Sequence, residues 1–535
     1  MNPPNKTQEI LFILRKSGAN RHISMQFIPI IWQIPQQSVI LQRQNIINYK
    51  KNKKHEIITL ADMKMVAFIL LALWGVVALG SRAQTSLPHV MLEVAEEVSH
   101  DRKVSATFTL EQTDEATGSE TTEIHKCRVS YSGESSSSYD KKSWNVHFID
   151  DDGEELYVNL LGLRANCSKW ILDAAAGDRS RMRNRVAMDV FVRYARLPYE
   201  TDNARRYCSL GRYVEVWVNG EYKGLFCLTD RINRELLGGT ATMEGQTRCV
   251  IYNCKNYGSG NYLNPYEEGP ADGDEQWNSW EMKYPDEPTA EAWQTLLNLF
   301  NVAWDNTPDD DYVATVRRYF YWDNLVEVYL QTLVCGLADM GYKNAYLVCP
   351  DITQDSRCVL VPVDMDYTFG CTWNGCYWDE KPQLRGGSTL HFVRPFSHPM
   401  RTEDLGFVAA LAERWAALRD DALSVASFTA LINGYAQLLD ESGAWQRERE
   451  LWNYNPVAIE ETAAEAARYM TEWYANSHEA ISQLLAPYLP TAVKAVKSES
   501  INDQDACYDL LGRSLPSLTN YKGIYIKDYH KRFEK

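Results

Sequence analysis

Alternating hydrophobic and polar residues predict β-strands in the part of the chain between residues 103 and 230. The runs KVSATFTL (103–110), ETTEIHKCRVSYS (120–132) and SWNVHF (143–148) place apolar side chains at about every second position, as expected of strands with one buried face. Two further runs of this kind flank Asn219-Gly220, a dipeptide that favours the two-residue turn of a β-hairpin. The amino-terminal half is therefore predicted to be rich in β-structure.

Other segments repeat their apolar residues at the period of a helix. In residues 178–197, Met182, Val186 and Val190 share one face, and Asp178 is placed to cap the helix. The same period marks four further segments: residues 289–304, 317–338, 406–440 and 461–485. The predicted fold class is α+β, with a β-rich amino-terminal lobe and a helical carboxyl-terminal lobe.

Two short apolar runs interrupt the helical pattern, AYLVC (345–349) and RCVLVPV (357–363). Their length and their β-branched residues favour two buried strands joined by a turn at residues 350–356. Residues 255–285 and 370–401 follow neither period. Both are therefore predicted to be long surface loops, and the first is also rich in Gly, Asn and Asp, as loops often are.

The first 62 residues are rich in Asn, Gln and Lys and follow neither period. Residues 63–83 then show the pattern of a secretory signal peptide: a positive residue, an apolar run over residues 66–79 and a small-residue cleavage site. A signal peptide inside a chain is unusual, so Met63 is predicted to be the true start and residues 1–62 an upstream extension read through in error. The apolar run is short for a membrane-spanning helix, which predicts an exported protein.

The charge of the chain limits its partners. The sequence has 55 Lys+Arg, 71 Asp+Glu and a formal net charge of −16. Residues 1–83 hold 11 of the basic and 3 of the acidic residues, which leaves 44 against 68 and a net charge of −24 after their removal. A protein this acidic repels nucleic acid and anionic membrane and attracts cations. We therefore expect no nucleic-acid partner and, after removal of the signal, no integral membrane span.

All 12 cysteines lie after residue 83. An even number of cysteines in an exported protein permits disulfides, and Cys249/Cys254 and Cys371/Cys376 are the pairs closest in sequence. Buried free thiols are the alternative, because unpaired cysteine is common in protein cores. The spacing does not match that of a zinc site.

The candidate chemistry surrounds the two short strands described above. Asp339 and Asn344 precede the first strand, and Asp364 and Asp366 follow the second. Asp and Asn beside a turn often only cap it or face solvent. A site for phosphoryl transfer, in contrast, needs carboxylates that hold Mg²⁺ and one carboxylate near the acceptor hydroxyl. In protein kinases an Asp, an Asn five residues later and a further Asp after a hairpin occur in this order.

Several motifs in one order resemble the CotH kinases, a family named for a spore-coat protein. They are SGESSSSYDKKSWNVHF (132–148), LGLRANCSKWILDAAAGDRSRMRNRVAMD (161–189), VEVWVNGEYKGLFCLTDRI (214–232), WEMKYPDE (280–287) and the Asp…Asn and Asp-x-Asp pairs. The resemblance extends from about Ile124 to Leu484. Residues 124–490 are therefore predicted to be a CotH kinase-like domain, preceded by a β-rich segment at residues 84–123.

The resemblance implies an atypical protein-kinase-like fold that uses ATP and Mg²⁺ (or Mn²⁺) to phosphorylate Ser or Thr of extracytoplasmic proteins. Asp339 would be the catalytic carboxylate that positions the acceptor hydroxyl. Asn344, Asp364 and Asp366 would hold the metal ion. Because these polar residues match the family's pattern, cation binding is the best supported part of the implied site.

Basic and hydroxyl side chains would complete the implied site. Lys142 and Arg183 would contact the phosphates of the cofactor, with solvent exposure of Lys142 and a bracing role for Arg183 as the alternatives. Asn184, beside Arg183, would either contact phosphate or brace the two lobes. The Ser-rich stretch at residues 132–138 would be a candidate site of self-phosphorylation.

Three positions depart from the family's pattern. Ser132 stands where Arg is usual, which removes a cation, and Val363 stands where Trp is usual, which removes a flat surface for a nucleobase. Asp230 replaces the usual Glu after the hairpin at residues 219–220. These departures affect nucleotide recognition more than the predicted metal ligands.

The carboxyl-terminal tail, residues 491–535, has a resemblance of its own. The stretches YDLLGR (508–513) and KGIYIKDYHKR (522–532) resemble the type IX sorting segments of secreted Bacteroidetes proteins, although Tyr529 stands where Gly is usual. Two short strand-like runs around a turn predict a small terminal hairpin. The tail implies transport to the cell surface or the medium, with the periplasm as the fallback.

Two other classes of function compete with a kinase. A surface adhesion or scaffold protein would keep the fold and a structural cation without phosphoryl transfer. A glycoside hydrolase would use paired carboxylates, but Asp364 and Asp366 are too close in sequence to lie on either side of a glycosidic bond.

Overall fold

The computed structural model describes most of the chain after residue 85. The described ranges are residues 86–113, 117–133, 135–163, 167–199, 208–243, 245–255, 268–304, 314, 316–336, 344–372, 374–378, 381–382, 406–453 and 457–489, together with four short strands between residues 507 and 534. The predicted upstream extension and signal peptide lie outside these ranges. Among the described residues, no helix combines the length and the hydrophobicity needed to cross a membrane.

The amino-terminal part forms a closed barrel with the strand order β1-β2-β3-β4-β5-β7-β6. Its strands are β1 (His89–Val94), β2 (Val104–Thr113), β3 (Glu120–Ser132), β4 (Ser143–Phe148), β5 (Lys169–Asp173), β6 (Gly211–Val218) and β7 (Glu221–Asp230). Neighbouring strands are antiparallel except β1 and β6, which pair in parallel and close the barrel. The prediction of a β-rich amino-terminal region is confirmed, and barrel closure is a feature that the strand pattern did not predict.

Alternation of side chains fills the barrel. Inward-facing residues of all seven strands form one buried cluster, which includes Val90, Leu92, Phe108, Leu110, Val129, Val146, Phe148, Trp170, Leu172, Val214, Val216, Phe226 and Leu228. Every second residue of a strand points to the same face, so the apolar period of two in the sequence becomes the barrel interior. The predicted turn at Asn219-Gly220 is confirmed: both residues have positive φ, 50° and 79°, as a two-residue hairpin turn requires.

A second sheet of five strands has the order β12-β11-β8-β10-β9. Its members are β8 (Val250–Cys254), β9 (Gln276–Trp277), β10 (Trp280–Tyr284), β11 (Ala345–Cys349) and β12 (Val359–Pro362). The predicted strand pair β11–β12 is confirmed as an antiparallel hairpin. The loop predicted over residues 255–285 is wrong at β10, where buried Trp280 and Met282 alternate with more polar neighbours.

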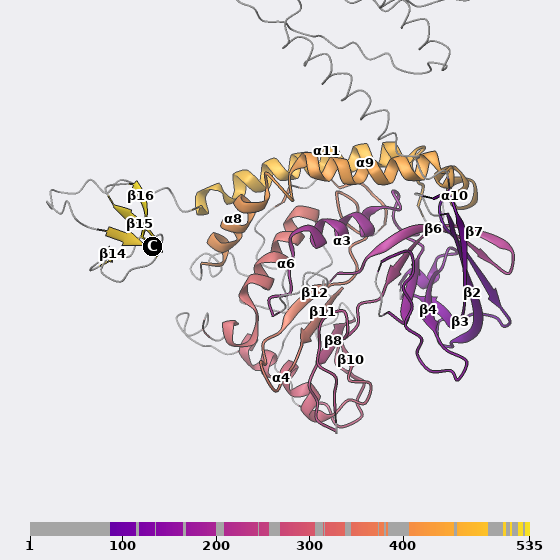
Figure 1. Cartoon of the computed structure of the whole chain (residues 1–535), viewed down its shortest axis with the longest axis horizontal. Coiled ribbons are helices and arrows are strands. Elements are labelled where there is room, and N and C mark those ends of the chain that lie inside the picture. The colour runs from indigo at the N-terminus through magenta and orange to yellow at the C-terminus, as the bar shows by residue number, and fades with distance from the viewer. Residues whose placement is uncertain are drawn as a thin grey trace, which may run out of the picture. The chain divides into compact units, whose positions relative to one another are not determined.

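Helices fill the carboxyl-terminal part and one connection of the barrel. They are α3 (Arg183–Tyr194), α4 (Ala290–Trp304), α6 (Trp322–Cys335), α8 (Phe407–Leu418), α9 (Val425–Glu441), α10 (Ala444–Trp452) and α11 (Ala463–Leu485), with short 3-10 turns η1 (Ser135–Ser138) and η4 (Ala486–Tyr488). Figure 1 shows α9 and α11 side by side. The prediction of an α+β protein with a helical carboxyl-terminal half is confirmed.

Two sequence predictions about smaller features need correction. The tail contains a four-stranded sheet of order β14-β13-β15-β16 rather than a single hairpin, formed by β13 (Cys507–Asp509), β14 (Ser514–Leu515), β15 (Gly523–Lys527) and β16 (His530–Glu534). All cysteines from Cys127 to Cys376 are free thiols, so neither predicted local disulfide is present. Cys249 and Cys254 lie at the two ends of the extended strand β8, roughly 16 Å apart, which is too far for a disulfide.

Candidate active site

A cleft with a volume of about 490 Å³ is lined by both the barrel and the second sheet. The barrel contributes the turn between β3 and β4, the end of β5 and the end of β7. The second sheet contributes β8, β10 and the residues at the open end of the β11–β12 hairpin. Such a concave site with converging polar groups is the usual form of a small-molecule site.

Three predicted metal ligands line this cleft together. Asn344 precedes β11, and Asp364 and Asp366 follow β12. The backbone N–H of Val363 donates to the carbonyl of Asn344 at 3.1 Å, which holds the two ends of the hairpin next to each other. Asn344 has a φ of 63°, a conformation that Asn adopts more readily than most residues. The fourth residue of the predicted group, Asp339, lies outside the described residues.

Asn184 joins the Asp-x-Asp segment to the barrel. Its amide oxygen accepts a hydrogen bond from the backbone N–H of Met365 at 3.1 Å, and its amide nitrogen donates to Asp173 Oδ2 at 3.0 Å. Met365 lies between the two predicted metal ligands, and Asn184 and Asp173 both line the cleft. Asn184 therefore braces the position of both carboxylates, which is one of the two roles predicted for it.

The Ser-rich turn also lines the cleft. Ser132, Ser136 and Tyr139 line the cleft from the β3–β4 connection. Tyr139 and Tyr367 both pack on Gly177, where an added Cβ would lie 3.6 Å from the Tyr139 ring and 3.5 Å from the Tyr367 hydroxyl. Burial and the neighbouring charge of Asp366 raise the pKa of Tyr367, so its hydroxyl keeps its proton. This packing brings the turn close to the Asp-x-Asp segment.

Lys141, and not the predicted Lys142, lines the cleft. Its ammonium group is buried and donates to Ala174 O at 3.0 Å, Leu225 O at 2.5 Å and Glu448 Oε1 at 2.7 Å. These three bonds use all three donors of the ammonium group, so in this structure Lys141 acts as a brace. Lys142 is only half-buried, with Nζ 6.0 Å from the ring centre of Tyr131. A phosphate contact of Lys142 stays a prediction.

Glu448 of α10 is the counter-charge for two buried cations. Besides Lys141, it accepts from Arg181 Nε at 2.8 Å and from the backbone N–H of Leu225 at 2.9 Å. Burial alone would raise the pKa of Glu448, but the charges of Lys141 and Arg181 outweigh it and lower the pKa. Burial lowers the pKa of Lys141 to about 8 despite the attraction of Glu448. Both partners are therefore charged at neutral pH.

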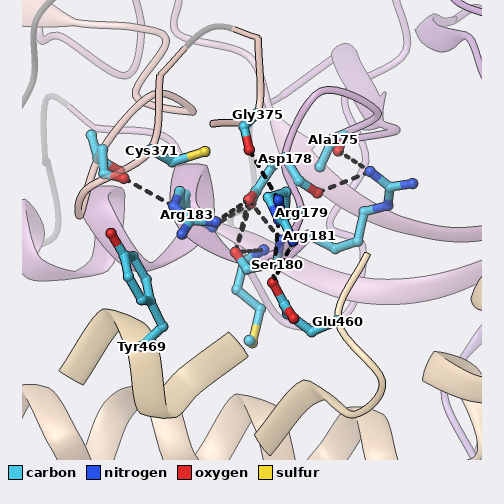
Figure 2. A network of polar contacts seen from close by, with 12 residues as sticks. Ala175, Asp178, Arg179, Ser180, Arg181, Arg183, Cys371, Gly375, Glu460 and Tyr469 are labelled. Atoms are coloured by element: carbon cyan, nitrogen blue, oxygen red, sulfur yellow. Dashed lines mark hydrogen bonds and ion pairs between the residues drawn. The ribbon is translucent and has the colours of Figure 1, made fainter. Parts of the chain in front are cut away.

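The arginine predicted to contact phosphate belongs to a second buried network, which Figure 2 shows around Asp178. Arg183 Nη1 donates to Asp178 Oδ1 at 2.6 Å, and Arg183 Nε donates to Thr368 O at 2.9 Å. Asp178 also accepts the backbone N–H of Ser180 and of Arg183, the first residue of α3. The N-cap position itself is Met182, so the predicted N-cap at Asp178 is wrong, although its carboxylate does bind the start of the helix. Arg183 is 1% exposed, and its contacts are those of a brace. A phosphate contact of Arg183 stays a prediction.

The donor set fits a hard divalent cation. Two carboxylates and an amide oxygen are the ligand types that Mg²⁺ and Mn²⁺ prefer, and Asp364, Asp366 and Asn344 supply them at one wall of the cleft. Within the described ranges, no three His, Cys, Asp or Glu side chains are grouped as a metal site requires. Of the predicted site, only Asp364 and Asp366 belong to these side chains. Asn344 is an amide, and Asp339 lies outside the described residues.

Sequence reasoning missed several residues of the cleft. Asp173 ends β5, and Glu281 and Lys283 lie two residues apart on β10, so they point to the same face. Glu281 Oε1 is 2.7 Å from Lys283 Nζ, and its other oxygen accepts from Asn253 at 3.3 Å. The alternating run WEMKY could have indicated a strand that carries Glu281 and Lys283 on one face. A lone Asp at the end of a strand, such as Asp173, has no comparable sequence signal.

Comparison with known families identifies the chain. A family model described as CotH kinase protein matches residues 129–481, which include the barrel strands β4 to β7, the second sheet, the lining of the cleft apart from His100, and most of α11. The chain belongs to the CotH kinase protein family. No curated protein matches the sequence. The resemblance found in the sequence motifs is thus confirmed at the level of the family, and this family implies ATP-dependent phosphorylation.

Proposed function

We propose that this protein is an exported kinase that transfers the γ-phosphate of ATP to a Ser or Thr hydroxyl of an extracytoplasmic protein, with Mg²⁺ or Mn²⁺ as cofactor. One observation carries the proposal: Asn344, Asp364 and Asp366 line the same cleft as residues of a Ser-rich turn. Phosphoryl transfer asks a protein mainly for positioned charges and a site that orients two oxygens in line. In the cleft, Asn344, Asp364 and Asp366 provide the charged and polar groups, and the Ser-rich turn provides hydroxyl groups.

The chain order of the cleft residues supports a kinase-like arrangement. Residues of the β3–β4 connection line the cleft, and residues 230–232, which also line it, connect the barrel to the second part of the protein. Asn344, the hairpin β11–β12 and then Asp364 follow in the order that protein kinases use for their metal ligands. The departures at Ser132, Val363 and Asp230 all fall on residues that line the cleft, so nucleotide contacts are expected to differ from those of other family members.

The residues of the cleft have distinct roles in this proposal. Asn344, Asp364 and Asp366 would hold the cation, which neutralises charge on the phosphates when it is bound. Asn184 keeps the two aspartates in place through Met365. Asp339, five residues before Asn344, would accept the hydrogen bond of the acceptor hydroxyl and orient its oxygen towards the γ-phosphate. Ser136, which lines the cleft, is a candidate acceptor in the protein itself.

Transfer of label from γ-labelled ATP to casein tests this function. The native protein is expected to transfer label only with Mg²⁺ or Mn²⁺, and a chelator should abolish transfer because the phosphates are then not neutralised. Asp339→Ala should lose transfer, whereas Asp420→Ala, at an aspartate that is 82% exposed, should not. Phosphopeptide mapping of the same samples would detect label in the Ser-rich turn. Equal transfer by both variants, or no transfer by any preparation, would favour an adhesion or scaffold protein.

We further propose that the mature protein begins after residue 83 and acts at the cell surface or in the medium. The support is the signal pattern at residues 63–83 and the resemblance of residues 491–535 to type IX sorting segments. Amino-terminal sequencing of the protein from its native source is expected to start within a few residues of Gln84. Detection of residues before Met63 would exclude both the proposed start and the proposed signal peptide.

A further inference from the structure

A row of basic side chains crosses the outer face of the barrel. Arg128 on β3 pairs directly with His147 on β4, and His147 pairs with Lys169 on β5. Lys103 Nζ lies 3.4 Å from His147 Nδ1, and the backbone N–H of Arg231 donates to Lys169 O at 3.1 Å. We call these five residues the basic row. They come from five separate segments of the sequence, and barrel formation brings them together.

The basic row brings like charges together. Arg128 and Lys169 lie on either side of His147, whose pKa is lowered by burial and by the charges of Lys103 and Lys169, so the cations of the row are Lys103, Arg128, Lys169 and Arg231. The whole chain, in contrast, carries a net charge of −16. Burial, followed by the charges of Lys169, Arg231 and Arg128, lowers the pKa of Lys103. A group of cations that repel each other on an acidic protein gains from a bound anion, because the anion relieves the repulsion.

One carboxylate, Glu155, pairs with the middle of the basic row. It lies 2.8 Å from Lys169 Nζ and 3.1 Å from His147 Nε2. Burial alone would raise its pKa, but hydrogen bonds from Lys169 and His147 outweigh this and lower the pKa of Glu155 to about 2. Glu155 therefore supplies one negative charge beside the Lys and Arg side chains of the row. The acidic turn at residues 150–154 borders the row at Arg128, whose Nη2 lies 3.3 Å from a Cβ built on Gly153.

The basic row leads into the cleft. Arg231, its last member, lines the cleft together with Asp230, the final residue of β7. A polypeptide bound along the row would thus continue past Arg231 into the space between the Ser-rich turn and the Asp-x-Asp segment. Lys103 and Arg128 are exposed and do not line the cleft.

We propose that the basic row binds an acidic segment of the acceptor protein and guides the neighbouring Ser or Thr into the cleft. Binding of the acidic segment does not depend on the proposed kinase function, whereas guiding a Ser or Thr into the cleft rests on it. Carboxylates of Asp and Glu are the complementary groups, and exposed charge pairs each contribute little individually but act together along a row. The expected acceptor is therefore a Ser or Thr flanked by several acidic residues.

Binding of a labelled peptide tests the basic row without any catalysis. The probe is a fluorescein-labelled peptide of Asp and Glu around one Ser, and the measurement is fluorescence anisotropy at low ionic strength. The test variant is Lys103→Glu/Arg128→Glu, and the matched control is Lys381→Glu/Arg468→Glu, which changes the same residue types at exposed positions elsewhere. We expect the test variant to weaken binding by about tenfold or more, and the control to bind like the native protein.

A transfer assay on the same peptide separates this proposal from the proposed function. The test variant should raise KM for the acidic peptide and leave kcat unchanged, since neither substituted residue lines the cleft. Charge-selective binding without any transfer would contradict the kinase function and leave the basic row established. Equal peptide binding by the test and control variants would contradict the proposal that the basic row binds an acidic peptide. If the test variant instead lost binding to vesicles containing phosphatidylserine and bound the peptide normally, the ligand of the row would be a membrane surface and not an acceptor protein.

Discussion

Asp366→Asn is expected to reduce phosphoryl transfer by more than about a hundredfold while the protein remains folded. The substitution keeps the size of the side chain and one oxygen but removes a negative charge from the wall of the cleft that Asp364 and Asn344 share. A divalent cation is then held by one carboxylate instead of two, which weakens its binding and its neutralisation of the phosphates. The measurement is label transfer from ATP, with Mn²⁺ affinity from calorimetry on the same variant.

Asp420→Asn is the matched control for this experiment, because the Asp420 side chain is 82% exposed and does not line the cleft. It should transfer label and bind Mn²⁺ like the native protein. If Asp366→Asn bound Mn²⁺ normally and still lost transfer, its role would be in chemistry and not in holding the metal. If it transferred label at the native rate, the cleft would not be the site of phosphoryl transfer.

Glu448→Gln is expected to lower the free energy of unfolding by about 3–5 kcal/mol. The change removes the single negative charge between Lys141 and Arg181, both of which are buried. An amide can still accept one hydrogen bond, but it leaves two cations inside the protein without a counter-charge. The measurement is urea unfolding followed by tryptophan fluorescence.

Glu450→Gln provides the comparison on the same helix. Glu450 is exposed and accepts a hydrogen bond from Gln446 in the preceding turn, so its substitution should change the unfolding free energy by less than about 0.5 kcal/mol. Similar losses for the two variants would mean that the buried ion pairs do not stabilise the fold. The effect of Glu448→Gln on stability would then be no larger than that of a substitution at an exposed charged residue.

Local patterns predicted the parts of the fold that local physics determines. The strands β2 to β4, the Asn219-Gly220 turn and the hairpin β11–β12 follow from alternation and turn chemistry within a few residues. Barrel closure was not predictable in this way, because β1 and β6 pair in parallel across more than one hundred residues. The strand β10 was missed because the Gly- and Asn-rich residues before it dominated the composition of the segment.

The same distinction applies to the candidate site. Asn344, Asp364 and Asp366 could be predicted because they flank one short hairpin, and the structure brings them to one cleft. The choice of Lys142 over Lys141 could not be corrected from sequence, since the partner of Lys141 lies 307 residues later. Alternation also fails just before β4 begins, where Lys141 is buried and Lys142 is half-buried.

The position of β1 limits how far the amino terminus can be shortened without loss of the barrel. Leu87 is 2% exposed, and the carbonyl of Pro88 accepts the backbone N–H of Glu215. A protease that trimmed the chain past these two residues into β1 would remove the strand that closes the barrel and expose the edges of β2 and β6. The cleavage proposed above, after residue 83, would leave three residues before Leu87, so it is compatible with a closed barrel.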